Sequence, residues 1–323
     1  ATREMLDAKH ARRQADERKR LQAFVDRFKA KASKARQAQS RVKMLERMKP
    51  VTALVTQDVR EISFPTPEKM LSPPIIAVDD VSVGYDPKKP VLNRVTLRID
   101  TDDRIALLGS NGNGKSTLVK LLANKLQPFS GRVTRAEKLS VGYFAQHQVD
   151  ELNLDGSPYD HVRRLMPEAT ETKVRGRVGA IGFSGKAGDT LVRSLSGGEK
   201  ARLLLGLATF YGPNMIILDE PTNHLDIDSR AALAEAINDF PGAVIMVSHD
   251  RYLIEACADQ LWVVANQTVT AYDGDLDEYR RMVLSIGDTR NGSRDRGNER
   301  TRENAKPERG RRKLTRHSIV FVD

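Results

Sequence analysis

Cysteine and long apolar runs are both scarce in this sequence. The 323-residue chain has a single cysteine, Cys257, so it can form neither an intramolecular disulfide nor a cysteine-clustered metal site. No segment approaches the roughly 18 to 20 uncharged apolar residues of a membrane-spanning helix. The N-terminal residues are charged from Arg3 onward and lack an apolar signal core. We therefore expect a cytoplasmic protein, in a reducing compartment, without membrane segments.

Proline and glycine are missing from residues 1–49, which consist largely of strong helix formers. Their apolar residues are sparse and suit a narrow seam between two paired helices. The pattern predicts a helical segment over residues 1–50 that folds back as an antiparallel hairpin. A single long solvated helix is the alternative. A cluster of prolines then predicts a connecting segment over residues 51–74.

The net charge of +10 is unevenly distributed along the chain. Residues 1–50 hold 16 Lys and Arg against 6 Asp and Glu, and residues 284–323 hold 11 against 6. The middle of the chain is mildly acidic, with 26 basic against 31 acidic residues. The excess positive charge thus lies in two flanking segments, as expected when these segments contact a polyanion. Residues 284–323 have almost no apolar side chains before Ile319 and are predicted to be a disordered basic tail.

Residues 75–283 alternate short β-branched runs with helical stretches, which predicts an α/β domain with a largely parallel sheet. The expected strands cover residues 75–83, 91–99, 104–108, 140–144, 215–218, 244–247 and 260–264, and the expected helices cover 114–125, 197–210 and 229–239.

A glycine-rich loop follows the apolar run 105–108 and precedes a helical pattern, which is the context of a phosphate-binding P-loop. Its residues are Gly109, Ser110, Asn111, Gly112, Asn113, Gly114, Lys115, Ser116 and Thr117. The backbone N–H groups of such a loop and the helix N-terminus attract phosphate, Lys115 reaches the β and γ phosphates, and Ser116 offers its hydroxyl to Mg²⁺. We expect ATP and Mg²⁺ as ligands.

Two carboxylates end the apolar run 215–218, about 100 residues after the P-loop. Asp219 is predicted to hold Mg²⁺ directly or through water, and Glu220 to polarise the attacking water as general base. Each acid alone could instead cap the turn at Pro221.

A third motif, Leu195, Ser196, Gly197, Gly198 and Glu199, precedes a helical stretch and places Ser196 as its N-cap. Alone it has this ordinary capping explanation. With the P-loop and the Asp219–Glu220 pair, it resembles the signature motif of the ATP-binding cassette family, and the resemblance covers residues 75–283. It implies a P-loop NTPase fold with a helical subdomain, preceded here by the helical hairpin.

The same resemblance implies roles for further residues. Tyr85 is expected to stack on adenine, Gln146 to contact Mg²⁺ and nucleotide, and His249 to act with Glu220 as the switch histidine. Leu225 and Asp226 are expected to form the D-loop. In this family two cassettes pack head to tail, so the signature motif of one completes the ATP site of the other.

Two segments point to a narrower family. Residues 221–226 read Pro-Thr-Asn-His-Leu-Asp, and residues 24–48 form a basic helical stretch. Both resemble the ABC-F family of twin-cassette proteins, with residues 1–50 as the linker between cassettes. The resemblance implies a C-terminal half, whose partner is the first cassette or a second copy of this chain. It also implies that the linker contacts tRNA or ribosomal RNA, with phosphate-contacting candidates Arg27, Lys29, Lys31, Lys34, Arg36, Arg41 and Lys43.

The leading functional hypothesis is an ATP-driven translation factor that associates with the ribosome. A DNA-associated ATPase acting through the linker and tail is one alternative, and a transporter ATPase subunit is another. A basic helix pair that serves only as a spacer is the alternative for the linker.

Overall fold

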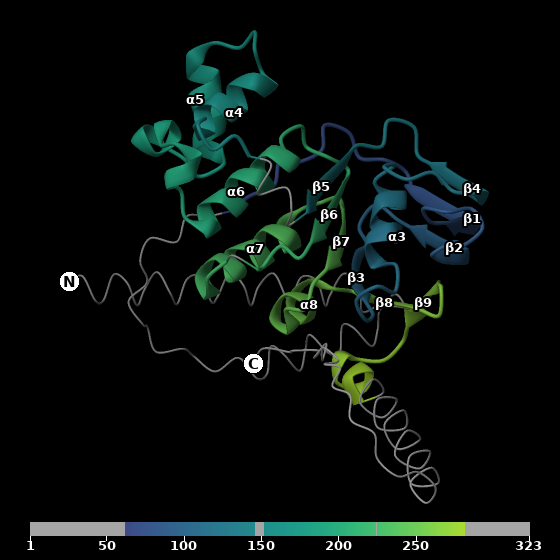
Figure 1. The fold of residues 1–323 in the computed structure, drawn as a ribbon. Coiled ribbons are helices and arrows are strands. Elements are labelled where there is room, and N and C mark those ends of the chain that lie inside the picture. The colour runs from purple at the N-terminus through teal and green to yellow at the C-terminus, as the bar shows by residue number, and fades with distance from the viewer. Residues whose placement is uncertain (1–61, 146–151, 224, 282–323) are drawn as a thin grey trace, which may run out of the picture.

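The computed structural model describes residues 62–145, 152–223 and 225–281 (Figure 1). Several sequence predictions fall outside these residues: the helical hairpin over 1–50, residues 51–61 of the connecting segment, Gln146, the seven basic RNA-contact candidates and the tail over 284–323.

The centre of the fold is a six-stranded sheet in the order β5-β6-β7-β3-β8-β9. Neighbouring strands are parallel except for the β8–β9 hairpin. The strands are β3 (Arg104–Leu108), β5 (Val141–Ala145), β6 (Met215–Asp219), β7 (Ala243–Val247), β8 (Gln260–Ala265) and β9 (Thr268–Tyr272). Every residue of β3 and β7 is buried, as expected for parallel strands that are covered on both faces.

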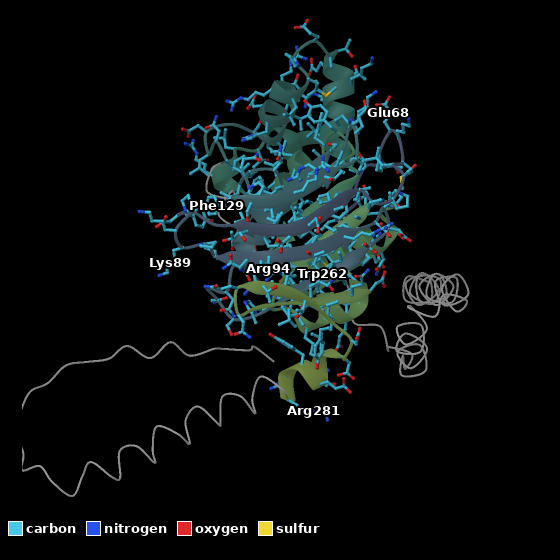
Figure 2. All side chains as sticks on the ribbon, turned by 90° about the vertical axis from the view of Figure 1, so that its right-hand side faces the viewer. Glu68, Lys89, Arg94, Phe129, Trp262 and Arg281 are labelled. Atoms are coloured by element: carbon cyan, nitrogen blue, oxygen red, sulfur yellow. The ribbon has the colours of Figure 1, made fainter. Side chains whose placement is uncertain are left out.

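A separate antiparallel sheet has the order β2-β1-β4. Its strands are β1 (Ile76–Val83), β2 (Leu92–Ile99) and β4 (Ser130–Arg135). Figure 2 looks at this side of the molecule and labels Arg94 of β2 and Trp262 of β8. The backbone N–H of Asn93 donates to Gln267 O at 2.7 Å, so the β8–β9 hairpin contacts the edge of the smaller sheet.

The two faces of the parallel sheet carry different cores because successive side chains of a strand point to opposite faces. On β6, Met215 and Ile217 pack with helix α3 (Lys115–Leu122) and the antiparallel sheet, whereas Ile216 and Leu218 pack with the helical part of the domain. Helix α3 therefore lies between the two sheets.

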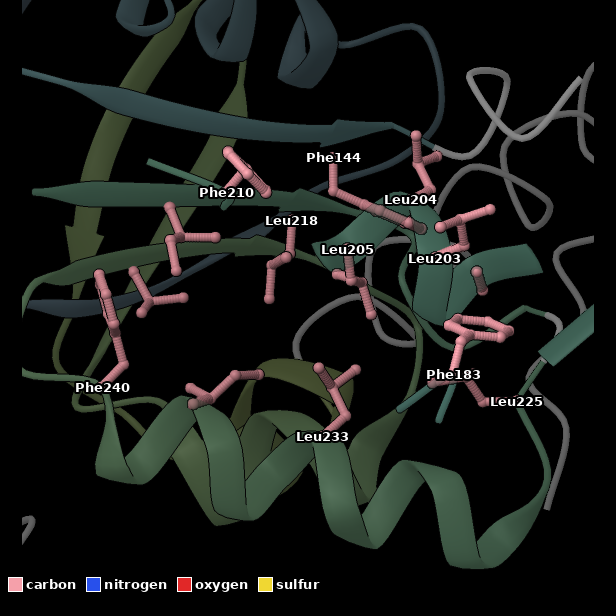
Figure 3. Close-up of a cluster of buried hydrophobic side chains, with 14 of the residues drawn as sticks. Phe144, Phe183, Leu203, Leu204, Leu205, Phe210, Leu218, Leu225, Leu233 and Phe240 are labelled. Atoms are coloured by element: carbon pink, nitrogen blue, oxygen red, sulfur yellow. The ribbon is translucent and has the colours of Figure 1, made fainter. Parts of the chain in front are cut away.

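The helical part contains α4 (Pro158–Leu165), α5 (Glu171–Ala180), η2 (Gly185–Asp189), η3 (Val192–Ser194), α6 (Gly197–Ala208), α7 (Ile227–Asp239) and α8 (Arg251–Cys257). Figure 3 shows its core, which contains Leu203 and Leu205 of α6, Leu233 of α7 and the sheet residue Leu218. A capping box between Ser157 and Asp160 begins α4. Helices α4 and α5 project away from the sheet (Figure 1).

The predicted α/β class and the P-loop NTPase topology with a helical subdomain are confirmed. Each expected strand and helix is present with ends shifted by a few residues. Strands β4 and β9 and helices α4, α5 and α8 were not predicted.

Candidate functional site

The glycine-rich loop connects β3 to α3, and its backbone requires glycine. Gly109 has φ +140°, and a Cβ there would lie 2.4 Å from the carbonyl oxygen of Val264. Gly114, the N-cap of α3, has φ +101°, and its Cβ would lie 2.9 Å from the Leu92 side chain. Glycine adopts such positive φ values without a steric cost. The sequence pattern therefore corresponds to a tight turn at the start of α3.

Lys115 is the first residue of α3, and its ammonium group lies back over the loop. Nζ donates to the carbonyl oxygens of Gly109 at 2.6 Å and Ser110 at 3.3 Å, and lies 3.4 Å from Asn111 Oδ1. Burial lowers the pKa of Lys115, and the carboxylates of Glu220 and Asp219 partly oppose this shift. Positive charge, the loop N–H groups and the N-terminal end of α3 thus converge at one place, which suits an anionic ligand.

Glu220 has an unusual backbone conformation. It follows Asp219, the last residue of β6, and has φ +53°, a value uncommon outside glycine. Its backbone N–H donates to Val247 O at the end of β7, at 2.7 Å. The neighbouring strand therefore holds the chain in this conformation just where the side chain turns toward the site.

The Glu220 carboxyl group has a strongly perturbed pKa. Burial and, second, the negative charge of Asp219 raise the pKa of Glu220 to about 7, against the opposing effects of the His249 backbone N–H and Lys115. His249 Nε2 lies 3.5 Å from Glu220 Oε1. The pKa of His249 is lowered, by burial and then by Lys115. A carboxyl group with a raised pKa is thus paired with an imidazole whose pKa is lowered.

These groups meet because their strands are adjacent. The P-loop follows β3, Glu220 follows β6 and His249 follows β7, and β7 lies between β3 and β6 in the sheet. The carboxyl ends of parallel strands form the ligand-binding edge of open α/β sheets. The sequence-predicted P-loop, carboxylate pair and switch histidine are therefore brought together at one edge.

The side chains at this edge suit a nucleotide with Mg²⁺. Ser116 is exposed at the start of α3, and Asp219 ends β6, so this edge carries a hydroxyl and a carboxylate, the hard oxygen ligands that Mg²⁺ prefers. Among the described residues, no group of three or more His, Cys, Asp or Glu side chains could hold a metal ion. The arrangement fits a metal ion whose remaining ligands come from phosphate and water.

Tyr85 follows β1 and is 62% exposed. Its hydroxyl oxygen accepts a hydrogen bond from Lys120 Nζ of α3 at 3.2 Å, and the same nitrogen lies 5.4 Å from the ring centroid. An exposed ring held beside the P-loop helix suits stacking on a base. Lys120 was not a sequence candidate, because only folding brings it to a residue 35 positions away.

The signature segment forms the start of α6. Ser196 is its N-cap, as predicted, and shares a reciprocal capping box with Glu199. The Ser196 hydroxyl also donates to Glu199 Oε2 at 3.0 Å. Helices α3 and α6 pack with opposite faces of the parallel sheet. The P-loop and the signature segment are therefore carried by opposite layers of the domain.

The two D-loop residues have different environments. Leu225 is buried near Phe183 in the helical-side core (Figure 3). Asp226 is the N-cap of α7, where its Oδ1 accepts from the Ser229 backbone N–H at 2.7 Å, and hydrogen bonds from Ser229 lower the pKa of Asp226. The core thus anchors one residue of the loop, and the helix cap anchors the next.

Comparison with protein families and known proteins agrees with this geometry. A family model described as "ABC transporter" matches residues 92–223, and a second model with the same description matches residues 1–64. "Probable ATP-binding protein YheS" of Escherichia coli K12 is 46% identical over 266 residues, covering 82% of this chain and 41% of that protein.

Similar relatives occur in eukaryotes. "Protein GCN20" of Saccharomyces cerevisiae is 40% identical over 87% of this chain and 38% of its own length. "ATP-binding cassette sub-family F member 3" of Mus musculus is 40% identical over 82% of this chain and 38% of its own length. The chain thus spans less than half the length of these relatives.

A solved structure shares the fold. A bacterial Atm1-family ABC exporter with ATP bound matches 76% of this chain and 46% of its own, with a TM-score of 0.54 and 21% identity. Within the described ranges of this chain, no helix is long and apolar enough to cross a membrane. The motifs, their assembly at one sheet edge and the relatives lead to one conclusion: the chain belongs to the ABC-F family of ATP-binding cassette proteins.

Proposed function

We propose that this chain binds ATP with Mg²⁺ and hydrolyses it in a site completed by a second cassette. The observation that carries the proposal is the meeting of Lys115, Glu220 and His249 at the ends of three adjacent strands. The relatives named as ATP-binding proteins support the choice of nucleotide.

The site residues divide the chemistry among them. Hydrolysis joins a water oxygen to the γ-phosphorus and breaks the bond from that phosphorus to the β–γ bridging oxygen, while the water loses a proton. Glu220 is the acceptor for that proton, since a base with a pKa near the working pH is efficient. His249 holds the Glu220 carboxyl group in place. Lys115 and the loop N–H groups stabilise the phosphate charge, and Mg²⁺ supplies further charge neutralisation when bound.

The missing half of each site comes from a second cassette. Ser196 to Glu199 begin a helix on the layer opposite α3, so this chain's signature segment suits the P-loop of another cassette better than its own. That cassette is the first half of a twin-cassette protein or a second copy of this chain.

We further propose that the ATP cycle controls binding to the ribosome, in the cytoplasm. The support is the charge of the N-terminal segment, where 16 Lys and Arg oppose 6 Asp and Glu within residues 1–50. Backbone phosphates of tRNA or ribosomal RNA are the partners expected for the basic residues from Arg27 to Lys43.

Binding and hydrolysis are tested first on the chain itself. Lys115→Met should abolish ATP binding, measured with a fluorescent ATP analogue, whereas Glu220→Gln should retain binding and lose hydrolysis. Unchanged hydrolysis in Glu220→Gln would refute the assignment of the base.

The partner is tested by sedimentation of Glu220→Gln with ribosomes at physiological salt, because basic segments bind RNA non-specifically at low salt. ATP should increase co-sedimentation. Replacing the seven basic candidates between residues 27 and 43 by glutamine should abolish this increase. The same replacement of Arg309, Arg311, Arg312 and Lys313 in the tail is the matched control and should not. Stimulation of hydrolysis by DNA instead of ribosomes would favour the DNA-associated alternative.

A further inference from the structure

Arg230, on the first turns of α7, contacts two loops of the candidate site at once. Its Nε donates to the carbonyl oxygen of Leu225 in the D-loop at 3.1 Å. Its Nη1 lies 3.4 Å from Oδ2 of Asp250, the residue that follows His249. One guanidinium group thus joins the loop that ends before α7 to the loop that begins α8.

Asp250 is well placed to transmit a displacement of the D-loop to the neighbouring residue His249. Its Oδ1 accepts from the Leu253 backbone N–H at 3.1 Å and caps α8, and its own N–H donates to Ser248 Oγ at 3.0 Å. The side chain is only 9% exposed. Within the part of the chain that the structure describes, the buried Oδ2 makes no hydrogen bond and has the Arg230 guanidinium as its ion-pair neighbour.

We propose that Arg230 is a positioning residue that couples the D-loop to the His249–Glu220 pair. The Leu225 carbonyl and the Asp250 carboxylate are held by the same planar group, so a displacement of one loop shifts the other. The inference rests on the proposed function, in which the D-loop faces the second cassette. Arg230 then makes the arrangement of the hydrolytic pair in one cassette sensitive to the docking of the other.

A purely structural role makes a different prediction, and a double mutant separates the two. If Arg230 only neutralises the buried Asp250 charge, then Arg230→Met combined with Asp250→Asn removes the charge and restores activity. If Arg230 couples the loops, the double variant stays as impaired as Arg230→Met alone. Asp250→Asn is suitable because asparagine also caps helices well, so α8 keeps its N-cap.

The experiment measures steady-state ATP hydrolysis and equilibrium ATP binding by the chain. Arg230→Met should lower kcat about 10-fold to 100-fold, as expected when a catalytic group is misplaced by a fraction of an ångström to 1 Å. ATP affinity should change less than twofold. Arg230→Lys keeps the positive charge but not the two-loop contact, and should recover only part of the loss.

Arg251→Met is the matched control. Arg251 is the next residue after Asp250 and makes ion pairs with Glu255 at 2.8 Å and Asp277 at 3.0 Å, neither of which belongs to the D-loop. Its hydrolysis should stay within about twofold of wild type, as for surface ion pairs of small energetic weight.

A second measurement, NMR of His249, tests the coupling by Arg230 without depending on ATP hydrolysis. In the nucleotide-free chain, NMR of the His249 imidazole, assigned with His249→Ala, should show a shifted signal in Arg230→Met and an unchanged one in Arg251→Met. Recovery of activity in the double variant, or an unmoved His249 signal, would overturn the coupling. A wild-type chain that neither binds nor hydrolyses ATP would instead overturn the proposed function.

Discussion

Replacing Glu220 by glutamine should stabilise the folded chain, but only as the pH rises. Burial and the charge of Asp219 raise the pKa of Glu220 from 4.5 to about 7 in the folded state. The unfolded chain keeps the ordinary pKa and loses the proton more easily. The stability of the wild type therefore falls as pH rises through this interval and remains reduced above about 7.

The size of the effect follows from the difference between the two pKa values. Each pKa unit corresponds to about 1.4 kcal/mol, so a rise from 4.5 to about 7 gives at most about 3 kcal/mol. The Glu220 side chain is 20% exposed, and solvent screening lowers the expected cost to about 1 to 3 kcal/mol. Glutamine has nearly the same shape and can accept the same backbone hydrogen bond from His249, so the variant removes the charge and little else.

The assay is urea unfolding at pH 5, 6, 7 and 8 without nucleotide, monitored by fluorescence of the single tryptophan, Trp262. The stability difference between Glu220→Gln and wild type should be small at pH 5 and should grow to about 1 to 3 kcal/mol at pH 8. Glu255→Gln, at an exposed ion pair with Arg251, is the control and should show no such growth. A difference that does not change with pH, or a variant less stable than wild type at pH 8, would refute the reasoning.

Three further predictions concern local structure. Gly109→Ala should lower the free energy of unfolding by about 3 to 5 kcal/mol, because its Cβ would lie 2.4 Å from Val264 O at φ +140°. Gly112→Ala, at φ +84° with open space around the Cβ, should lower it by only about 1 to 2 kcal/mol. Equal losses of the two variants in urea unfolding would contradict this. Ser196→Ala removes the N-cap of α6 and should cost about 1 kcal/mol in thermal unfolding, with Ser196→Asn retaining most of the stability. Arg104→Met should cost about 2 to 4 kcal/mol, because the buried guanidinium donates to backbone carbonyls at the end of α7 and in the turn after it, and a loss under 1 kcal/mol would show that water replaces it.

The parallel strands could be predicted because burial on both faces leaves continuous apolar runs, as in β6 and β7. The missed elements lack such a signal. Strand β4 reads Ser-Gly-Arg-Val-Thr-Arg and has no buried residue, because it lies at the edge of its sheet. Helix α5 buries only Val174 and Val178, too few to produce an amphipathic pattern. Their positions depend on contacts with the rest of the fold rather than on local sequence.

Some residues of the candidate site could likewise be predicted from the sequence, and others could not. The P-loop and the Asp219–Glu220 pair are contiguous motifs whose flanking strand and helix patterns confirm their context, so the sequence alone located them. Arg230 and Asp250 are 20 residues apart and meet only because α7 and α8 pack together. Nothing in the sequence near either residue signals the other. A residue whose role is to connect two loops can therefore be found only once both loops have been placed.

The carboxyl end of β6 carries a conformational cost and an electrostatic cost at the same residue. Glu220 combines a positive φ with a carboxyl group that burial and Asp219 make reluctant to ionise. Both are maintained by neighbours on rigid elements: β7 accepts the Glu220 N–H, and the cores on the two faces of the sheet hold β6 and β7 in register. A chain selected for stability alone would not keep an acidic residue there. If Glu220 is the base proposed above, this cost is retained for catalysis, and Glu220→Gln should both remove hydrolysis and stabilise the fold.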